Sequence, residues 1–492
     1  MIEELKKLIK EYSPNANFDL IEKAYNFASN AHSYQTRASG EPYINHCFNT
    51  AKILTELRLD EATICAALLH DILEDTLVVR EELKEEFGEE ITTLVEGVTK
   101  INSYKFTDNI TEQAENWRKM LLAIVKDTRV IIIKLADRLH NMRTIKYLPP
   151  DKQKEISLET LTLYTPFAHR LGIYKWKSEL EDLIFEVLQP VKYHEIKSKW
   201  QARSESNLKN LEIVKKQLEE KIKTLNIKYR MLARPKNLYG IYRKMQRQEK
   251  PFSDIHDLFG LRVVTDTKEH CYAVLSVIQS EFNVLENSFT DYIAVPKANM
   301  YQSLHITIVS DQNVIVEVQI RTEEMHRRAE YGIAAHWRYK EAFNKNGANN
   351  LKQTDINMEH HLEFIKHILE SQKDVKDSNE FLTAIKTECN FDQIYVTTPK
   401  GAAIKLPEGA TALDFAYAVH SDIGDRCMGV KVDGKIVPLD YKLKTGQKCE
   451  ALVRKNVNPT EHWLSIAVTA QARSRIRKYL REHPKKTGKS KK

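Results

Sequence analysis

An apolar run at residues 64–69 leads directly into the string His-Asp-Ile-Leu-Glu-Asp at residues 70–75, and this stretch constrains the fold most. The run predicts a buried helix. Residues four apart share a helix face, so His70 is expected to lie over Glu74 and Asp71 over Asp75. Charged and ligating groups beside a buried surface are costly unless something pairs with them. A divalent metal ion with an activated water would explain the set, and a solvated helix edge is the alternative.

Two further residues complete a possible metal site. His46 follows the start of a predicted helix at Ile44, and Asp137 follows the apolar run at residues 130–135. Either residue alone is more often a packing or capping group than a ligand. With His70 and Asp71 they supply two imidazoles and two carboxylates, a set that suits Mn²⁺, Fe²⁺ or Zn²⁺ better than Ca²⁺. Their convergence in space is a hypothesis.

Length and composition indicate a soluble chain of several domains. The 492 residues suggest three or four domains, and no run of eighteen apolar residues or signal peptide is present. The six cysteines form no C-x-x-C pair, which predicts reduced thiols and a cytoplasmic protein. The net charge is +7, of which residues 473–492 carry +9, leaving −2 for the preceding residues. Only this tail is strongly basic, which suits rRNA contact or solubilising lysines.

Three strings in the first third resemble a known hydrolase. They are T-R-x-S-G-E-P-Y-I-x-H at residues 36–46, H-D-x-x-E-D at 70–75 and L-A-D-R-L-H-N-M-R at 135–143. They resemble the HD-type, metal-dependent hydrolase domain of the RelA/SpoT family, which makes and destroys the alarmones (p)ppGpp. The resemblance implies a Mn²⁺ site and an attacking water positioned by Glu74 and Asp75. It also implies substrate contacts from Arg37, Ser39, Asn141 and Thr144.

The sequence changes character after Tyr229. A group of Lys and Arg residues comes first, and segments with the pattern of β-strands follow. Four cations lie within residues 234–244, and apolar strand-like segments follow at 261–264, 306–309 and 314–320. Such a cation cluster is more often a solvated helix face. Near strand ends, with Asp257 and Glu317 as possible Mg²⁺ ligands, it suits a nucleoside triphosphate site.

The strings in this region resemble the synthetase domain of the same family. They are R-P-K-x-x-Y-x-I-x-R-K-M, D-L-x-x-L-R-V-V, D-Y-I-A-V-P-K-x-N-M-Y-Q-S-L-H and E-V-Q-I-R-T. That domain transfers pyrophosphate from ATP to the 3′-hydroxyl of GDP or GTP. The resemblance implies that Arg234, Lys236 and Lys244 bind ATP, that Asp257 holds Mg²⁺, and that Glu317 assists the metal or deprotonates the hydroxyl. Tyr301 would stack on guanine, and the acceptor site would be lined by Lys297, Asn299, Gln302 and His305.

Two positions depart from the family pattern. Bifunctional relatives carry R-x-K-D and synthetase-only relatives E-x-D-D, whereas this chain has Ser-Phe-Thr-Asp at residues 288–291. The departure leaves the GDP or GTP preference and the Mg²⁺ dependence open. Gly240 stands where the family commonly has serine. Neither departure removes a predicted metal ligand, so we expect an active synthetase.

The C-terminal third is similar to a TGS domain, a small β-grasp module. The order strand, turn, strand and helix is predicted over residues 393–420, and a strand at 451–453. In long family members this module meets uncharged tRNA on the ribosome, and His420 matches a contact position. One more helix is expected through residues 463–468. The further regulatory modules of long relatives are not recognisable, so we expect a short or truncated member.

We therefore predict a multidomain chain with an all-α hydrolase domain, an α/β nucleotidyltransferase-like synthetase domain and a TGS domain. The predicted divisions are hydrolase 1–155, helical connector 156–200, synthetase 201–342, linker and helix 343–388, TGS 389–454, and helix with basic tail 455–492. Two activities that undo each other would only consume ATP, so mutually exclusive active states are expected. The alternatives are a hydrolase with a silent synthetase and a non-enzymatic ribosome- or tRNA-binding regulator.

Overall fold

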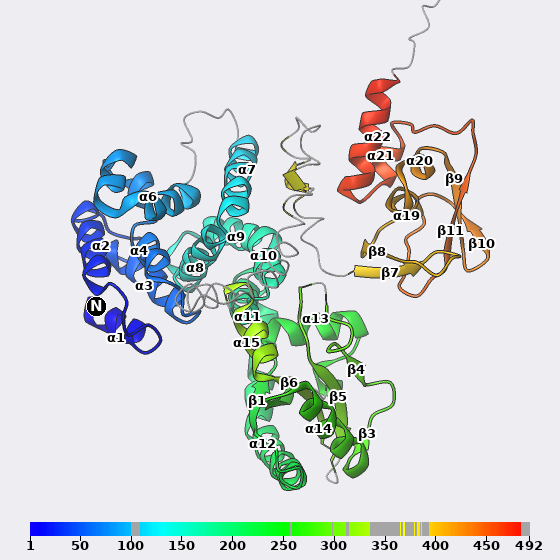
Figure 1. Ribbon diagram of the computed structural model, residues 1–492, viewed down its shortest axis with the longest axis horizontal. Helices are drawn as coiled ribbons and strands as arrows, with labels where there is room; N and C mark the ends of the chain where they lie inside the picture. Colours follow the sequence, from blue (N-terminus) through cyan, green and yellow to red (C-terminus); the bar gives the residue numbers. More distant parts are fainter. Residues whose placement is uncertain are drawn as a thin grey trace, which may run out of the picture. The chain divides into compact units, whose positions relative to one another are not determined.

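The computed structural model describes residues 1–99, 109–255, 258–297, 299–310, 314–334 and 393–483, together with 365, 368–369, 378, 381–383 and 385. The chain forms two compact units (Figure 1). Unit 1 comprises Met1–Glu96 and Ile132–His361, and unit 2 comprises Gly97–Ile131 and Leu362–Lys492.

The first part of unit 1 is helical, as predicted. Its elements are α1 (Ile2–Lys10), α2 (Phe18–Ala31), α3 (Ile44–Thr55), α4 (Glu61–Leu68), α5 (Ile72–Asp75), α6 (Arg80–Val98) and α8 (Arg129–Arg143). Side-chain caps mark where helices begin: Asn17 Oδ1 accepts from the Leu20 N–H at the start of α2, and Asp60 Oδ1 from the Thr63 N–H at the start of α4. Helix α7 (Asn109–Lys126) belongs to unit 2.

The predicted continuous helix through residues 64–75 is interrupted. Helix α4 ends at Leu68 and α5 begins at Ile72, so His70 and Asp71 lie in the intervening turn. Consecutive residues of a continuous helix point about 100° apart, so a break allows both side chains to face one centre. The Asp75 N–H still donates to the Asp71 carbonyl at 2.9 Å, which keeps Asp71 and Asp75 on one face, as expected.

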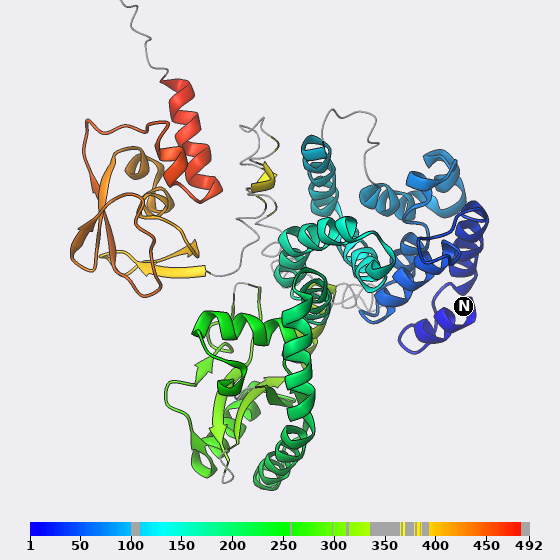
Figure 2. The same ribbon diagram turned by 180° about the vertical axis from the view of Figure 1, so that it is seen from behind.

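A helical connector follows the hydrolase region. It contains η2 (Ile145–Tyr147), α9 (Pro150–Glu159), a π-helical turn (Thr160–Tyr164), α10 (Thr165–Arg170), α11 (Tyr174–Leu188) and α12 (Pro190–Lys223). Pro190 is the first residue of α12, where proline is tolerated, and it marks the break between α11 and α12. Helix α12 passes through residue 200, where a division was predicted, and packs against the sheet that follows (Figure 2).

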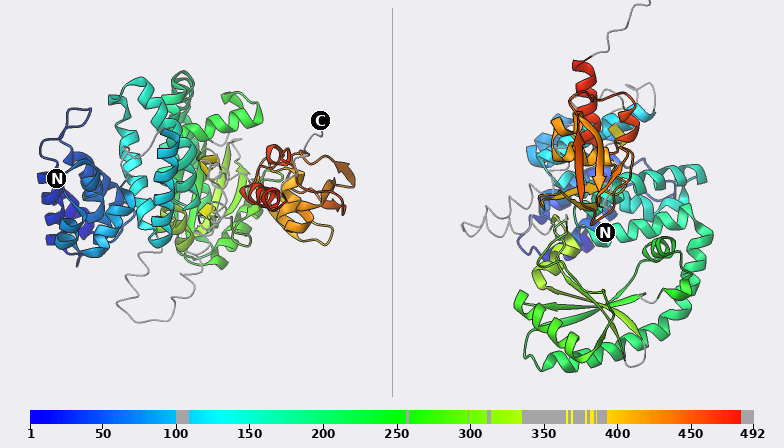
Figure 3. Two further views of the ribbon diagram at one scale, coloured as in Figure 1. Left: turned by 90° about the horizontal axis from the view of Figure 1, so that it is seen from above. Right: turned by 90° about the vertical axis from the view of Figure 1, so that its right-hand side faces the viewer.

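The second part of unit 1 is a six-stranded mixed sheet with helices. The strands are β1 (Tyr229–Pro235), β2 (Phe259–Thr265), β3 (Asn283–Val284), β4 (Thr290–Asp291), β5 (Leu304–Val309) and β6 (Ile315–Thr322). The order is β1-β2-β6-β5-β3, with β4 on β5; β2 and β6 pair in parallel, and the other described neighbours pair antiparallel. The sheet is visible in the right-hand view of Figure 3. The predicted strands are confirmed as β2, β5 and β6. The helical elements are α13 (Leu238–Gln248), η4 (Phe252–Asp254), α14 (Lys268–Glu281) and α15 (Glu323–Tyr331).

Unit 2 contains the predicted strand-turn-strand-helix module. Its elements are β7 (Gln393–Thr397), β8 (Ala403–Pro407), α19 (Ala412–Val419), α20 (Ser421–Asp425), β9 (Cys427–Val432), β10 (Lys435–Val437) and β11 (Cys449–Val453). A capping box between Thr411 and Asp414 begins α19.

The last predicted helix is two helices, α21 (Trp463–Ile466) and α22 (Ala470–Glu482). The Asp414 carboxylate accepts the backbone N–H groups of Val468 and Thr469, at 3.1 and 2.9 Å. These bonds replace helical ones, and the Thr469 side chain then caps α22. The expectation of one helix over 463–468 is therefore wrong.

Several sequence predictions fall outside the described residues. They concern Asp257, most of the predicted linker at 343–388, and the tail from residue 484. Among the described residues, no helix is long and apolar enough to cross a bilayer. The five described cysteines are free and buried.

Candidate metal centre and nucleotide cavity

The four predicted metal ligands converge in the helical part of unit 1. His46 Nε2, on α3, lies 3.1 Å from His70 Nε2 and 3.3 Å from Asp137 Oδ1, on α8. Asp71 Oδ2 lies 3.0 Å from His70 Nε2 and 3.5 Å from His46 Nε2. All four side chains are buried. Three separate elements therefore bring their ligating atoms to one point.

The hydrogen bond of His70 to the backbone leaves its Nε2 lone pair free for a cation. His70 Nδ1 lies 2.9 Å from the Ala67 carbonyl, and only the Nδ1–H form can make that bond. Neutral His70 then presents a lone pair on Nε2 toward His46 and the two carboxylates. Ligand atoms about 2.1 Å from one ion stand roughly 3.0–3.4 Å apart, which agrees with these separations. The set fits a divalent metal ion.

The pKa values of the ligand side chains also favour a cation at this point. Burial alone would raise the pKa of Asp71 and Asp137, but neighbouring cationic groups hold both well below the usual range. Burial opposes the charged form of His70, yet the two carboxylates raise its pKa to about 10. The centre therefore favours one added positive charge among its ligands, which a metal ion supplies.

Two outer groups on α8 hold the ligands and were not predicted. Lys134 Nζ lies 2.9 Å from Asp137 Oδ2, and His140 Nδ1 lies 2.8 Å from His46 Nδ1. Burial, then the nearby His46 and Arg37, lower the pKa of His140 to about 3, so it is neutral. Both residues lie three positions from Asp137, on its helix face. That spacing was the available signal.

Tyr43 ties a ligand to a predicted catalytic carboxylate. Its hydroxyl lies 2.8 Å from Asp71 Oδ2 and 2.9 Å from Asp75 Oδ2. Partial burial, then the neighbouring Asp71, raise the pKa of Asp75, unlike those of the two ligand carboxylates. Glu74 is exposed. Asp75 is thus placed beside the centre and binds a proton more readily than Asp71 does.

Arg37 and Asn141 extend the centre toward a substrate. Arg37 Nη2 donates to Asn141 Oδ1, and Asn141 Nδ2 donates to Asp137 Oδ1, both at 2.6 Å. Arg37 Nη1 is buried and has no hydrogen-bond partner among the described residues. Ser39 lies in the turn that follows Arg37, and the Thr144 hydroxyl donates to the His140 carbonyl at 3.0 Å. An unpaired guanidinium nitrogen beside a metal centre suits an anion.

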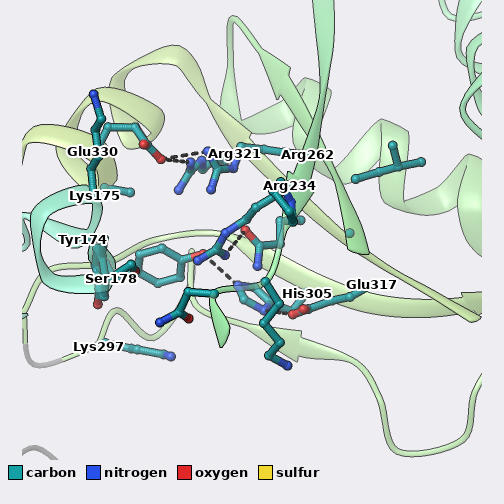
Figure 4. Close-up of a pocket in the computed structure, with 18 residues that line it drawn as sticks. Tyr174, Lys175, Ser178, Arg234, Arg262, Lys297, His305, Glu317, Arg321 and Glu330 are labelled. Atoms are coloured by element: carbon teal, nitrogen blue, oxygen red, sulfur yellow. Dashed lines mark hydrogen bonds and ion pairs between the residues drawn. The ribbon is translucent and has the colours of Figure 1, made fainter. Parts of the chain in front are cut away.

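A second site, a cavity of about 400 Å³, lies between the mixed sheet and α11 (Figure 4). Six predicted residues line it: Arg234, Lys236, Lys297, Tyr301, His305 and Glu317. Lining residues that were not predicted include Tyr174, Lys175, Ser178, Arg262, Arg321 and Glu330. The first three come from α11, outside the recognised strings, so sequence offered no signal for them.

Three predicted residues form a hydrogen-bonded row in the cavity. The Tyr301 hydroxyl lies 2.9 Å from His305 Nε2, and His305 Nδ1 lies 2.8 Å from Glu317 Oε1. In the antiparallel pair β5–β6, His305 is opposite Gln319 and Thr307 is opposite Glu317, so His305 and Glu317 are diagonal neighbours. Burial alone would raise the pKa of Glu317, but His305 and nearby cations lower it to about 2. Glu317 is therefore a persistent carboxylate.

The remaining charges make the cavity cationic. Arg262 and Arg321 share one carboxylate oxygen of Glu330, at 2.7 and 3.0 Å. Burial lowers the pKa of both arginines, of Arg262 to about 10. Both Nε atoms are buried without a hydrogen-bond partner among the described residues. A polyanion suits this wall.

Other predicted synthetase residues do not line the cavity. These are Lys244, Asn299 and Gln302. Asn299 Nδ2 donates to the hydroxyl of Tyr174, which does line it, and Gln302 Nε2 donates to the Ile293 carbonyl at 3.2 Å. Their substrate roles stay predictions, as does that of Asp257.

The two departures from the family strings lie outside the cavity. The Ser288 hydroxyl donates to the Leu285 carbonyl at 2.6 Å, and Asp291 Oδ1 accepts from two backbone N–H groups. A Cβ on Gly240 would stand 2.5 Å from Asn237 Oδ1, so a serine there requires Asn237 to move. These positions serve local structure.

In unit 2, His420 caps the short helix α20, with its Nδ1 accepting from the Asp422 N–H at 3.2 Å. Its side chain is 64% exposed. A contact with RNA at this residue stays a prediction.

Comparison with known proteins gives three matching domain families and relatives of which this chain spans about two thirds. Residues 24–174 match the HD domain, 233–344 the region found in RelA/SpoT proteins, and 394–451 the TGS domain. A guanosine-3′,5′-bis(diphosphate) 3′-pyrophosphohydrolase of Vibrio cholerae is 44% identical over 98% of this chain and 67% of its own length. The bifunctional (p)ppGpp synthase/hydrolase SpoT of Escherichia coli is 42% identical over the same shares. A GTP pyrophosphokinase of Myxococcus xanthus is 43% identical over 96% of this chain, which spans 62% of that relative.

Proposed function

This chain belongs to the RelA/SpoT family, and we propose that it is a bifunctional alarmone enzyme. The helical lobe would hydrolyse (p)ppGpp to GDP or GTP and pyrophosphate. The α/β lobe would transfer pyrophosphate from ATP to the 3′-hydroxyl of GDP or GTP. The observation that carries the proposal is the convergence of His46, His70, Asp71 and Asp137 on one buried point, in a chain that also holds a cationic cavity.

In the hydrolase lobe, those four residues would hold Mn²⁺. When bound, the ion would supply Lewis-acid activation of water and of a phosphoryl oxygen. Asp75 accepts the proton of the attacking water, because its pKa is raised while those of Asp71 and Asp137 are lowered. Tyr43 fixes the direction of the Asp75 carboxylate, and Glu74 orients the water from the exposed side.

The substrate would be held beside this centre by cationic and polar side chains. Arg37 Nη1, which has no partner among the described residues, binds a phosphate oxygen, and Asn141 fixes the guanidinium. Ser39 and Thr144 add hydroxyl contacts. Binding the pyrophosphate both at the metal centre and through Arg37 positions it for in-line attack.

In the synthetase lobe, positioning and charge neutralisation would supply most of the catalysis. Arg234, Lys236 and Lys244 bind the ATP phosphates. Asp257 and Glu317 hold Mg²⁺, and a Glu317 pKa of about 2 favours this ligand role over that of a general base. Tyr301 stacks on the guanine of the acceptor, with Lys297, Asn299, Gln302 and His305 around it.

The C-terminal unit would serve regulation in the cytoplasm. Its TGS domain presents His420 to uncharged tRNA on the ribosome, which biases the two lobes toward mutually exclusive active states. The predicted domain divisions, from the hydrolase at 1–155 to the tail at 455–492, are part of this proposal.

The test is a pair of nucleotide assays on the purified chain with Mn²⁺ and Mg²⁺. One contains labelled ATP with GDP or GTP, and the other contains guanosine tetraphosphate. Both reactions are expected, with Asp71→Ala abolishing only breakdown and Glu317→Ala only synthesis. Breakdown without synthesis would leave a hydrolase with a silent synthetase, and silence in both would leave a binding regulator.

A further inference from the structure

Lys134 is a buried cation that contacts the candidate metal centre from behind. Its ammonium lies 2.9 Å from Oδ2 of Asp137, while Oδ1 of the same carboxylate faces His46. Lys134 is 6% exposed and Asp137 is 5% exposed, so water and salt screen the pair poorly. Burying a cation here is costly, and the catalytic roles proposed above do not use it.

Lys134 adds a positive charge directly against the ligand set. Metal ligation requires both histidines to be neutral, so Asp71 and Asp137 contribute two negative charges that a divalent ion cancels. Counting the four ligands, the ion and Lys134, the loaded centre then carries one net positive charge, and the charges of Arg37 and Asp75 lie just outside this set. In a poorly screened site, a charge one carboxylate away acts strongly on both the ion and an incoming anion. Lys134 must therefore oppose metal binding and favour phosphate binding.

We propose that Lys134 sets the charge of this centre: it weakens binding of the divalent ion and keeps the loaded centre positive toward a polyphosphate substrate. It acts through Asp137, and so it is a positioning residue. The effect on substrate rests on the proposed hydrolase function, whereas the effect on metal binding does not.

The test is Lys134→Met in the full chain, stripped of metal with a chelator and titrated with Mn²⁺ alone by calorimetry. We expect Mn²⁺ to bind about tenfold or more tightly, because the repelling charge is gone and Asp137 gains a free oxygen. The KM for guanosine tetraphosphate should rise by about tenfold, since the loaded centre becomes neutral. A purely structural role for Lys134 predicts weaker Mn²⁺ binding.

The neighbouring buried cation provides a matched control. Arg138 is 8% exposed, and its Nη2 lies 2.8 Å from Glu159 Oε2, whereas the Lys134 ammonium lies against the ligand Asp137. Arg138→Met should lower stability in a similar way while Mn²⁺ affinity and the KM stay near those of the unsubstituted chain. Lys134→Arg, which keeps the charge, should also bind Mn²⁺ as the unsubstituted chain does.

Unchanged or weaker Mn²⁺ binding by folded Lys134→Met would overturn the inference. If Lys134→Met folds only with metal, recovery of its circular dichroism on addition of Mn²⁺ supports the inference. Lys134→Gln then tests the affinity. Lys134→Gln carries the same expectation, and an unchanged affinity in it refutes the inference. If the unsubstituted chain binds no Mn²⁺, the proposed hydrolase function fails. Mn²⁺ binding and hydrolysis by that chain, without tightening in the variant, refutes only the role of Lys134.

Discussion

His46 and His70 direct their Nε2 atoms at each other across 3.1 Å in a buried centre. With His70 bonded to the Ala67 carbonyl through Nδ1, this contact is favourable when a proton on one Nε2 joins the rings or when a cation lies between them. The stability of the fold around α3 and α8 therefore depends on what occupies the centre.

Metal binding should stabilise the folded chain. An ion that binds only the folded state raises the free energy of unfolding, by about 2.7 kcal/mol at a free concentration one hundred times Kd. Thermal unfolding with Mn²⁺ and with excess chelator should show this shift. Asp137→Ala is expected to abolish it, and an equal shift in that variant would place the ion elsewhere.

Tyr43→Phe should slow breakdown of guanosine tetraphosphate by about tenfold or more, because Asp71 and Asp75 lose their shared donor. The ring stacks on His32 at a centroid distance of 4.7 Å, and phenylalanine keeps that contact. Synthesis should be unaffected. Tyr25→Phe is the control, because the Tyr25 hydroxyl is exposed and contacts the Met1 sulfur at 3.9 Å. Equal loss in both variants, or loss of synthesis as well, would contradict a role for the Tyr43 hydroxyl.

Acid should destabilise the chain through His169 before the carboxylates titrate. Burial, then the nearby Lys177 and Lys297, lower the pKa of His169 from 6.5 to about 3. Between these values the unfolded chain binds the proton and the folded chain does not, so stability is full above 6.5 and falls as the pH falls. The slope is at most about 1.4 kcal/mol per pH unit. Urea unfolding between about pH 6.5 and pH 5 should show a smaller slope in His169→Gln than in the unsubstituted chain, and identical slopes would refute the assignment.

Gly332→Ala should lower the free energy of unfolding by more than about 3 kcal/mol. Gly332 ends α15 with a φ of +56°, and a Cβ there would stand 1.9 Å from the Leu171 carbonyl oxygen. The Ile333 N–H donates to that same oxygen at 2.8 Å, so the chains cannot separate without losing the bond.

Gly88→Ala is the control for backbone strain alone. Gly88 has a φ of +79° and a ψ of 170°, and a Cβ added to it would meet open space, so its cost should be about 1–3 kcal/mol of backbone strain. Chemical unfolding of both variants measures the difference. Similar costs would mean that the contact between the α10–α11 turn and α15 contributes little.

Much of the fold was predictable because local patterns decide it. Apolar stretches of the right period and length predicted β2, β5 and β6, and the strand-turn-strand-helix order over residues 393–420 predicted β7, β8 and α19. The break after Leu68 was not predicted, because apolar periodicity continues through a turn that directs His70 and Asp71 to one centre.

For the sites, the sequence by itself determined residue types: two imidazoles, several carboxylates and a row of cations in recognisable strings. Spacing along one helix could also have indicated Lys134 and His140. Only the tertiary structure decided that α3, the α4–α5 turn and α8 meet within hydrogen-bonding distance, and that α11 places Tyr174 and Ser178 against the cationic cavity. The physical reason is that periodicity fixes neighbours within an element, whereas packing of separate hydrophobic faces fixes which elements touch.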